Sequence, residues 1–491
     1  MSAPTARKGG VRSVVLALVA LPLVAGCALT GGLFGTVGPE YRVPQPLATQ
    51  WHAPRAHGGD ADALKSWWRR FDDPVLIELI DAAQQASATL VQAAARIERA
   101  RAEAIAAGVA GNPSLDGTAG ASRSAFSFGG PAVLRTQAQI GVQSSWEIDL
   151  FGGLARQRQQ AQASLEASTA SWHDARVALA AETANAYVNF RACEMNVELA
   201  RLDGASRAET ARVTGIAAGA GLHAPASAAL ASASAADAAA TLAQRRAQCE
   251  IDIKGLVALT AMDEAALRQR LARKPGEAPR LPRPAAFAVE AVPARVLAQR
   301  PDLAAAEREV AAASAAIGVA EAQRYPRLSL AGNITPTRSR LDGSPAISVR
   351  TWSIGPSLTL PLVDGERRAA NVDAARAEYA SAEAAFHARA RQAVREVEEA
   401  LVRIASAGER MEQVRSAAAG YGQSLAAVQT RQRAGLAALA ELEDARRISL
   451  AAQGAVVATE YEATAAWVAL YRAVGGDWDA RIEAPARRSK E

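Results

Sequence analysis

The chain has 491 residues, of which 50% are hydrophobic but only 5% are aromatic, and alanine supplies much of the apolar content. Because alanine is the best helix former and packs helices closely, this composition favours long helices in thin layers rather than a thick globular core. The formal net charge is +5, and no basic block with interleaved aromatic residues is present, which argues against a nucleic-acid-binding protein.

The N-terminal segment 1–26 has the three zones of a signal peptide. Three basic residues come first, an apolar stretch over 14–24 is too short to span a bilayer well, and small residues then lead to Cys27. This ending resembles the lipobox of bacterial lipoproteins, which implies cleavage before Cys27 and acylation of its thiol and its new amine. Residue 28 is alanine rather than aspartate, which by the sorting rule of such lipoproteins implies the outer membrane. The alternative is a plain signal peptide with an incidental cysteine.

Residues 27–73 contain glycine, proline and scattered tryptophan without a helical period, so we expect a lipidated, extended linker. The sequence Asp72-Asp73-Pro74 is typical of a helix start, with an N-cap followed by proline in the first turn. A helix is therefore predicted from about residue 74 to residue 110.

Two stretches of the chain, over 90–120 and over 303–333, repeat one another. Each contains a long alanine-rich run, one proline and an alternating segment, and an AGL triplet recurs later in each copy. We interpret the chain as a duplicated unit with pseudo-symmetric architecture rather than as a chance similarity of alanine-rich helices. The predicted parts are repeat 1 (74–260), a proline-rich linker (261–300), repeat 2 (301–474) and a C-terminal tail (475–491).

Each repeat has two alternating segments that predict a β-hairpin, at about 113–125 and 134–150 in the first copy and at about 327–334 and 351–362 in the second. A period of two with one apolar face fits a half-buried sheet on a soluble core, and it equally fits a membrane strand with a watery lumen. Four strands are too few to close a barrel, and an open edge is not viable in lipid. The membrane interpretation therefore requires several chains, and three would give twelve strands.

A very long helix is predicted after each hairpin, over about 153–218 and 366–433. A glycine turn and a shorter return helix follow each, over about 222–259 and 436–474. Apolar residues in the second long helix have heptad-like spacing, which favours coiled packing. At about 1.5 Å per residue, each long helix would reach about 100 Å.

Cys193 and Cys249 lie on opposite sides of the first glycine turn, at nearly equal sequence distances from Ala220. In an antiparallel helical hairpin their heights would differ by only about 3 Å. An oxidising periplasm then favours a disulfide between them. Two buried free thiols are the alternative, because side chains that point apart cannot be bridged.

No catalytic or cofactor-binding pattern is recognisable, so we expect neither an enzyme nor a cofactor: the five histidines lack metal-ligand spacing, and no glycine-rich phosphate loop follows a strand. The informative polar residues are Glu441 and Asp444, three apart just after the second glycine turn and therefore on one helical face. They form either a solvated patch that stabilises a helix N-terminus, or a ring of carboxylates at the mouth of a tube built by symmetry mates.

Seven sequence features keep their order and spacing along nearly the whole mature chain. They are the lipobox, VGPEYRVPQP (37–46), SSWEIDLFG (144–152), PDLAAAE (301–307), YPRLSLAGN (325–333), SLTLPLVDGERRAA (357–370) and AGLAALAELEDARR (434–447). Together they resemble the TolC/OprM outer-membrane efflux family, and most closely its NodT-type lipoprotein branch, the outer-membrane factors of RND efflux systems.

This resemblance implies an α+β membrane protein that forms a homotrimer. Each chain would give four strands to a twelve-stranded transmembrane β-barrel, which a long periplasmic α-helical barrel continues. Residues 28–73, the linker 261–300 and the C-terminus would form an equatorial belt. Cys27 would carry the lipid anchor in the outer membrane.

The implied function is passive conduction, as the outer-membrane channel of a tripartite efflux system with a periplasmic adaptor protein and an inner-membrane RND-type pump. The turns at Gly221-Leu222 and Gly435-Leu436 would be the tips that meet the adaptor. The family's acidic aperture falls on Glu441 and Asp444, with glutamate at a position where aspartate is common.

Two alternatives remain. The duct of a type I protein secretion system has the same fold, although the lipobox and the NodT-like motifs disfavour it. A coiled-coil lipoprotein without a pore is the alternative from another class, and it predicts neither a trimer nor an ion current.

Overall fold

The computed structural model describes residues 35–43, 67–71, 73–127, 129–274, 276–284, 286 and 299–477. The chain divides into two compact units, which we describe separately: a strand unit (1–44, 96–168 and 306–386) and a helical unit (45–95, 169–305 and 387–491). The signal peptide, Cys27 and residues 478–491 of the tail lie outside the described residues.

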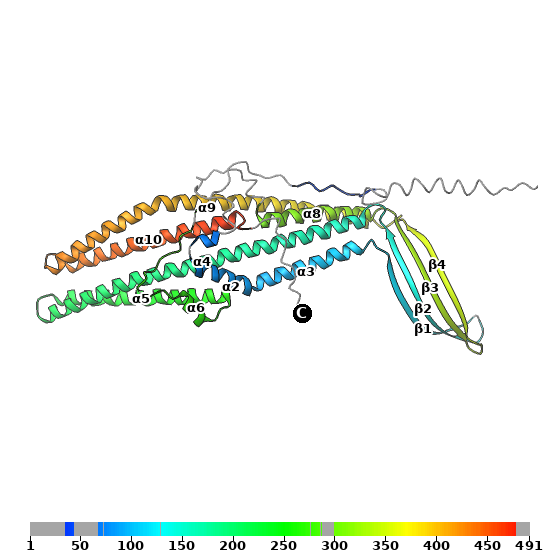
Figure 1. The fold of residues 1–491 in the computed structure, drawn as a ribbon, viewed down its shortest axis with the longest axis horizontal. Helices are drawn as coiled ribbons and strands as arrows, with labels where there is room; N and C mark the ends of the chain where they lie inside the picture. Colours follow the sequence, from blue (N-terminus) through cyan, green and yellow to red (C-terminus); the bar gives the residue numbers. More distant parts are fainter. Residues whose placement is uncertain are drawn as a thin grey trace, which may run out of the picture. The chain divides into compact units, whose positions relative to one another are not determined.

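The strand unit contains one antiparallel sheet with the strand order β1-β2-β3-β4 (Figure 1). Its strands are β1 (Ser114–Phe126), β2 (Val133–Ile148), β3 (Arg327–Leu341) and β4 (Ile347–Thr359). The two hairpins of the two repeats join through β2 and β3, which pair from Arg135 opposite Leu341 to Ile148 opposite Leu328. The four predicted strands are confirmed, but the bounds predicted for the second hairpin were wrong: β3 continues seven residues past 334 and β4 begins four residues before 351, because this hairpin turn is short and strand pairing continues almost up to it.

The helix predicted over 74–110 is two helices, α2 (Pro74–Ala86) and α3 (Ala88–Val109). Asp73 caps α2 as expected, since its carboxylate accepts hydrogen bonds from the backbone N–H groups of Val75 and Leu76. Ser87 interrupts the helix with extended backbone, and its Oγ accepts a hydrogen bond from the N–H of Leu90. The prediction of one helix was wrong because a serine can cap a new helix as readily as continue an old one.

The long helices and their return helices are present in both repeats. They are α4 (Gly153–Gly219) with α5 (Pro225–Thr260), and α9 (Arg367–Arg433) with α10 (Leu439–Ala473). A further helix, α8 (Pro301–Ala322), opens the second repeat and corresponds to α3 of the first. Among the described residues, no helix combines the length and the apolar character that crossing a membrane requires.

The linker over 261–300, expected to be irregular, contains the short helix α6 (Glu264–Leu271). Its N-cap is Asp263, whose carboxylate accepts hydrogen bonds from the N–H groups of Ala265 and Ala266. Leu267 and Leu271 bury the inner face of α6 in the core of the helical unit. The linker's remaining described residues form no further helix or strand.

The core of the helical unit is built around aromatic residues. Trp67 is fully buried and stacks on Tyr471 with ring centroids 4.9 Å apart. Tyr187 is also fully buried, and its hydroxyl donates a hydrogen bond of 2.8 Å to the carboxylate of Asp73. These contacts tie the start of α2 and the end of α10 to the middle of α4.

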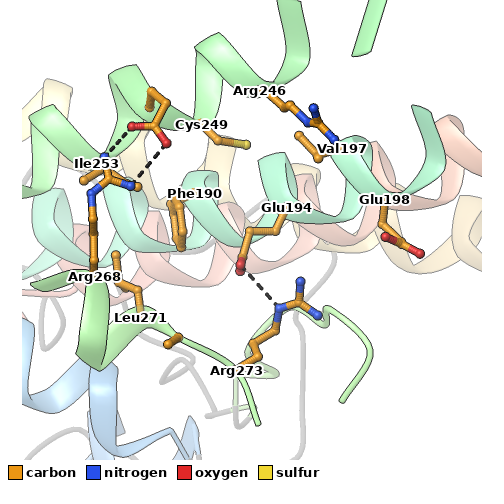
Figure 2. Close-up of a pocket in the computed structure, with 12 residues that line it drawn as sticks. Phe190, Glu194, Val197, Glu198, Arg246, Cys249, Ile253, Arg268, Leu271 and Arg273 are labelled. Carbon is orange, nitrogen blue, oxygen red and sulfur yellow. Dashed lines mark hydrogen bonds and ion pairs between the residues drawn. The ribbon is translucent and has the colours of Figure 1, made fainter. Parts of the chain in front are cut away.

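Cys193 of α4 and Cys249 of α5 form a disulfide, with their Cα atoms 5.6 Å apart. The bridge borders a pocket of about 380 Å³ between α4, α5 and α6 (Figure 2). Two ion pairs lie on the pocket wall: Arg268 of α6 contacts Glu250, and Arg273 Nε lies 3.3 Å from Glu194 Oε1. These ion pairs connect α6 and the residues just after it to the cross-linked hairpin.

Removing this bridge should lower the stability of the helical unit substantially. The cysteines are 56 positions apart, and closing a loop of that length restricts the unfolded chain by about 4 kcal/mol at 25 °C. We expect the C193A/C249A variant to unfold at a clearly lower denaturant concentration than the wild type, measured by the loss of helical circular dichroism. A reductant should shift the wild type to the same midpoint and leave the variant unchanged. Equal midpoints for the oxidised wild type and the variant would show that the bridge contributes nothing.

Candidate functional site

One face of the sheet is apolar and open to its surroundings. Because side chains alternate along each strand, the apolar residues of all four strands gather on this outward face. Among them, Trp352 is 72% exposed and Ile354 is 69% exposed. Other exposed members of the face are Leu115, Ile140, Val142, Ile334 and Leu358. A contiguous apolar face of this kind is typical of a surface that meets lipid or another protein.

The opposite face of the sheet, which we call the inward face, is mainly polar, with apolar residues near the hairpin turns, among them Phe126, Leu341, Ile347 and Val349. It borders a hollow of about 890 Å³. The amide and hydroxyl side chains that line this hollow are Thr118, Gln137, Gln139, Gln143, Asn333, Thr335, Thr337, Ser339, Ser344 and Thr351. The predicted two-faced pattern therefore holds in all four strands over the half of the sheet away from the hairpin turns, where the inward face is polar and the outward face is apolar.

Both edges of the sheet lack a partner within the described chain. Strand β1 pairs only with β2, and β4 pairs only with β3. Each edge therefore presents a row of backbone N–H and C=O groups that have no strand to bond with. An apolar face with open edges cannot stand alone in lipid.

The helical unit presents two turns with the same geometry. Gly221 and Gly435 adopt left-handed backbone, with φ of 76° and 74°. In each turn the leucine N–H donates back across the helix end, from Leu222 to Ala217 and from Leu436 to Arg431, both at 2.8 Å. This is a Schellman-type helix end, which favours glycine at the left-handed position. The two leucines are 77% and 71% exposed, so each tip displays one apolar side chain.

Glu441 and Asp444 lie in the first turns of α10, each paired with an arginine. Glu441 Oε1 accepts a hydrogen bond of 2.7 Å from Arg431, across the turn between α9 and α10. Asp444 Oδ1 accepts one of 3.1 Å from Arg447, one helical turn further on. Sequence analysis identified the acids but missed these partners, which compensate both charges within the chain. Both pairs are exposed, so each contributes little to stability.

A buried polar network lies directly behind these acids, and sequence analysis missed it. Glu443 of α10 accepts hydrogen bonds from Arg446 at 2.8 Å and from Ser234 of α5 at 2.6 Å, and it lies 3.0 Å from Arg207 of α4. Arg207 in turn pairs with Asp203 at 2.8 Å.

Arg446 extends the network to α4. Its guanidinium donates to Ser206 Oγ at 2.8 Å and to Thr210 Oγ1 at 2.7 Å. The arginine side chain is 6% exposed and that of Glu443 is 14% exposed. The network therefore joins the helical hairpin of the second repeat to that of the first by charge-assisted hydrogen bonds in a poorly hydrated place.

A sheet with an apolar outward face, a polar inward face and open edges, in one chain with paired helical hairpins, defines a subunit of an outer-membrane channel. The sequence profile of the outer membrane efflux protein family matches residues 79–261 and 292–476, and the chain belongs to this family. The same profile thus matches each half of the chain, in keeping with a duplicated unit.

Related proteins support the same assignment. OprJ of Pseudomonas aeruginosa is 30% identical over 460 residues, which cover 90% of this chain and 93% of OprJ. Nodulation protein T of Rhizobium leguminosarum bv. viciae is 29% identical over 392 residues, 79% of this chain and 78% of that protein. The solved structure of the outer-membrane channel OprN has a TM-score of 0.80 at 28% identity, and the match covers 90% of this chain and 99% of OprN.

The predicted resemblance to NodT-type and OprM-type efflux proteins is thus confirmed. The chain is the outer-membrane channel component of an efflux system. The solvent efflux pump outer membrane protein SrpC of Pseudomonas putida, 28% identical over 483 residues, belongs to the same set of relatives. This outcome favours efflux over the protein-secretion duct, and it removes the coiled-coil lipoprotein without a pore.

Proposed function

We propose that three copies of this chain close their sheets into one twelve-stranded barrel, through which solutes leave the cell passively. The observation that carries the proposal is the four-stranded sheet itself, whose outward face is apolar and exposed and whose edges β1 and β4 are open. Pairing β4 of one copy with β1 of the next gives the edge groups a partner strand and turns the apolar rows of the outward face toward lipid. The amide and hydroxyl groups of the inward face then line a watery duct.

The energy for transport comes from an inner-membrane pump of the RND type, because an open duct without an energy source of its own only conducts. The tips at Gly221-Leu222 and Gly435-Leu436 contact a periplasmic adaptor protein, for which their exposed leucines offer apolar anchors. Acylation of Cys27, which lies outside the described residues, adds a lipid anchor in the outer membrane.

The proposed aperture consists of Glu441 and Asp444 from three chains. Replacing both by alanine removes two negative charges per chain and leaves Arg431 and Arg447 without their acids. We expect the E441A/D444A variant to conduct more in planar bilayers, because the clamp across the α9–α10 turn is lost, and to prefer cations less. The E409A/E412A variant removes the same charge from exposed positions on α9 and serves as the control. Unchanged conductance and selectivity in E441A/D444A would remove the aperture assignment.

Cross-linking tests the trimer directly. Within one sheet β1 and β4 are three strand spacings apart, about 14 Å, which is too far for a disulfide inside one chain. We pair a cysteine at Ala119 or Ala121 of β1 with one at Trp352 or Ile354 of β4 and oxidise the purified protein. At least one combination should give a covalent trimer as the largest species on a denaturing gel, and the single-cysteine variants should not. Absence of any inter-chain product, or a ladder that continues past three chains, would contradict the proposal.

A further inference from the structure

Four arginines lie on the outward face of the sheet, close to the hairpin turns. They are Arg123 of β1, Arg338 and Arg340 of β3, and Arg350 of β4. In the strand register, Arg123 of β1 and Arg340 of β3 both pair with Thr136 of β2. Arg338 lies in the next row of outward-facing residues away from the turns, and Arg350 lies in the row after that. Each shares the parity of the apolar residues in its strand, as Arg350 does with Trp352. We call these four residues the arginine rim.

The arginine rim forms no ion pair within the described part of the chain, although one carboxylate, Asp342, lies in the turn two residues after Arg340. All four residues are exposed, and none forms an ion pair or a side-chain hydrogen bond there. The strands contain two further arginines, both on the inward face, and these have partners. Arg135 donates to Ser339 Oγ at 3.1 Å, and Arg327 lies 3.8 Å from Glu147. Charge on the outward face is therefore unbalanced, and it is positive.

A hollow of about 590 Å³ opens on this part of the sheet. Arg338 and Arg350 line it together with Ala138, Ile140, Pro336 and Ser348. Two arginines thus border a space whose other lining residues are mixed, with Ala138, Ile140, Pro336 and Val349 beside Gln139, Thr337 and Ser348. The apolar part of this lining and the two guanidinium groups suit a ligand that has an anionic head and a hydrocarbon tail.

The arginine rim lies at the edge of the apolar band. The outward rows without a charged residue run from Val142 to Ile148 along β2, a rise of about 20 Å along the strand, which at the usual tilt covers about 15 Å of the roughly 25 Å apolar band of an outer-membrane barrel. Trp352 occupies the row next to Arg350, where an aromatic residue is typical of a membrane–water interface. At the opposite end, where Ile148 and Leu328 pair, the outward face carries no arginine from the described strands.

We propose that the arginine rim binds phosphate-bearing lipid headgroups of the leaflet around the turn end of the barrel. The inference rests on the proposed barrel, whose strands then place the rim at headgroup level and the apolar rows against the acyl chains. A guanidinium fork matches the oxygens of a phosphate and stabilises it by charge-assisted hydrogen bonds. Because the four arginines without an ion pair lie only at the turn end of the strands, the barrel binds these lipids in the leaflet that surrounds that end.

Lipid binding to the full-length protein in a non-ionic detergent, measured by native mass spectrometry, tests this assignment. The probes are phosphatidic acid and diacylglycerol with identical acyl chains, which differ only in the phosphate. We expect the R338Q/R350Q variant to bind phosphatidic acid about 30-fold more weakly, roughly fivefold per arginine, and diacylglycerol as the wild type does. The R135Q variant, which removes an inward-facing arginine at the same end, should bind both lipids like the wild type.

The other outcomes are decisive too. Equal affinity of R338Q/R350Q and wild type for phosphatidic acid overturns the assignment, as does a wild type that binds diacylglycerol equally well. Displacement of the lipid by an equal concentration of inorganic phosphate would mean that the site takes free phosphate instead. Conductance of the same samples separates the two proposals. A wild type that does not conduct would contradict the proposed channel function. An R338Q/R350Q variant that conducts and binds phosphatidic acid as tightly as the wild type would contradict only the lipid-binding role of the arginine rim.

Discussion

Replacing Arg446 by alanine should destabilise the helical unit by about 2–3 kcal/mol, because the largely buried Glu443 loses one of its two arginine partners and keeps only Arg207, 3.0 Å away, and Ser234. In the wild type, Glu443 and Arg446 neutralise each other at 2.8 Å, with side chains 14% and 6% exposed. The variant also removes the two hydrogen bonds that connect α10 to Ser206 and Thr210 of α4. Chemical unfolding followed by circular dichroism measures the stability. Since the network joins the two helical hairpins, conductance in planar bilayers should rise as well.

Arg447→Ala is the matched control, since it changes the neighbouring residue and removes the same charge. Its side chain is 71% exposed and pairs with an equally accessible Asp444, so we expect less than about 0.5 kcal/mol of destabilisation. If R446A and R447A were equally stable, the network behind the aperture would have no structural importance.

The second large effect is expected at Arg300, just before α8. Its guanidinium is buried and contacts Asp302 at 2.9 and 2.8 Å, Glu396 of α9 at 2.9 Å and the carbonyl of Ala473 at the end of α10 at 2.7 Å. Alanine at position 300 leaves the buried carboxylate of Asp302 without its cationic partner. It also leaves the carbonyl of Ala473, at the end of α10, without this hydrogen-bond donor. We expect R300A to lose about 3–5 kcal/mol in the same unfolding measurement.

A double variant distinguishes the free-energy cost of an unpaired buried charge from the cost of lost side-chain packing. In R300M/D302N the buried charge pair is replaced by uncharged groups of similar size, so at least half of the stability lost in R300A should return. Arg395→Ala, which breaks the exposed pair with Glu399, should be close to neutral. A loss in R300A no greater than that in R395A would contradict the role given to Arg300.

The sequence was sufficient to predict that four strands, two long helices and the turns after those helices exist. The strands are 13 to 16 residues long, and the apolar–polar alternation over the half of each strand away from the hairpin turns was long enough to define both faces. The turn glycines were recognisable because helix ends need a left-handed residue, and φ is positive at both Gly221 and Gly435. By contrast, the break at Ser87 and the helix α6 depend on caps that compete with equally plausible local alternatives.

Motifs that are weak separately meet in the strand unit. Tyr41, from the VGPEYRVPQP stretch, donates a hydrogen bond of 2.9 Å to Glu307, the last residue of PDLAAAE. Arg308 lies over the Tyr41 ring, 5.6 Å from its centroid. Burial and then the hydrogen bond to Glu307 raise the pKa of the Tyr41 phenol, so it stays a neutral donor at physiological pH. The order of these motifs reflects a contact that the sequence alone does not reveal.

The candidate site was only partly predictable. The acids Glu441 and Asp444 were found because they share a helical face, and the Arg447 pair follows from the same spacing. The network around Glu443 joins α4, α5 and α10, which are far apart in the sequence, so it depends on how the two hairpins pack. The sequence pattern predicts each hairpin by itself, but it does not specify which side chains meet between them.

Single-channel recording on the full-length protein, with its oligomeric state checked in the same preparation, tests the central claim most directly. The account predicts a heat-sensitive trimer rich in β-structure that carries a steady ion current without any energy source. A protein that is monomeric in detergent and passes no current after reconstitution would contradict it, since a single sheet with open edges cannot form a wall in lipid.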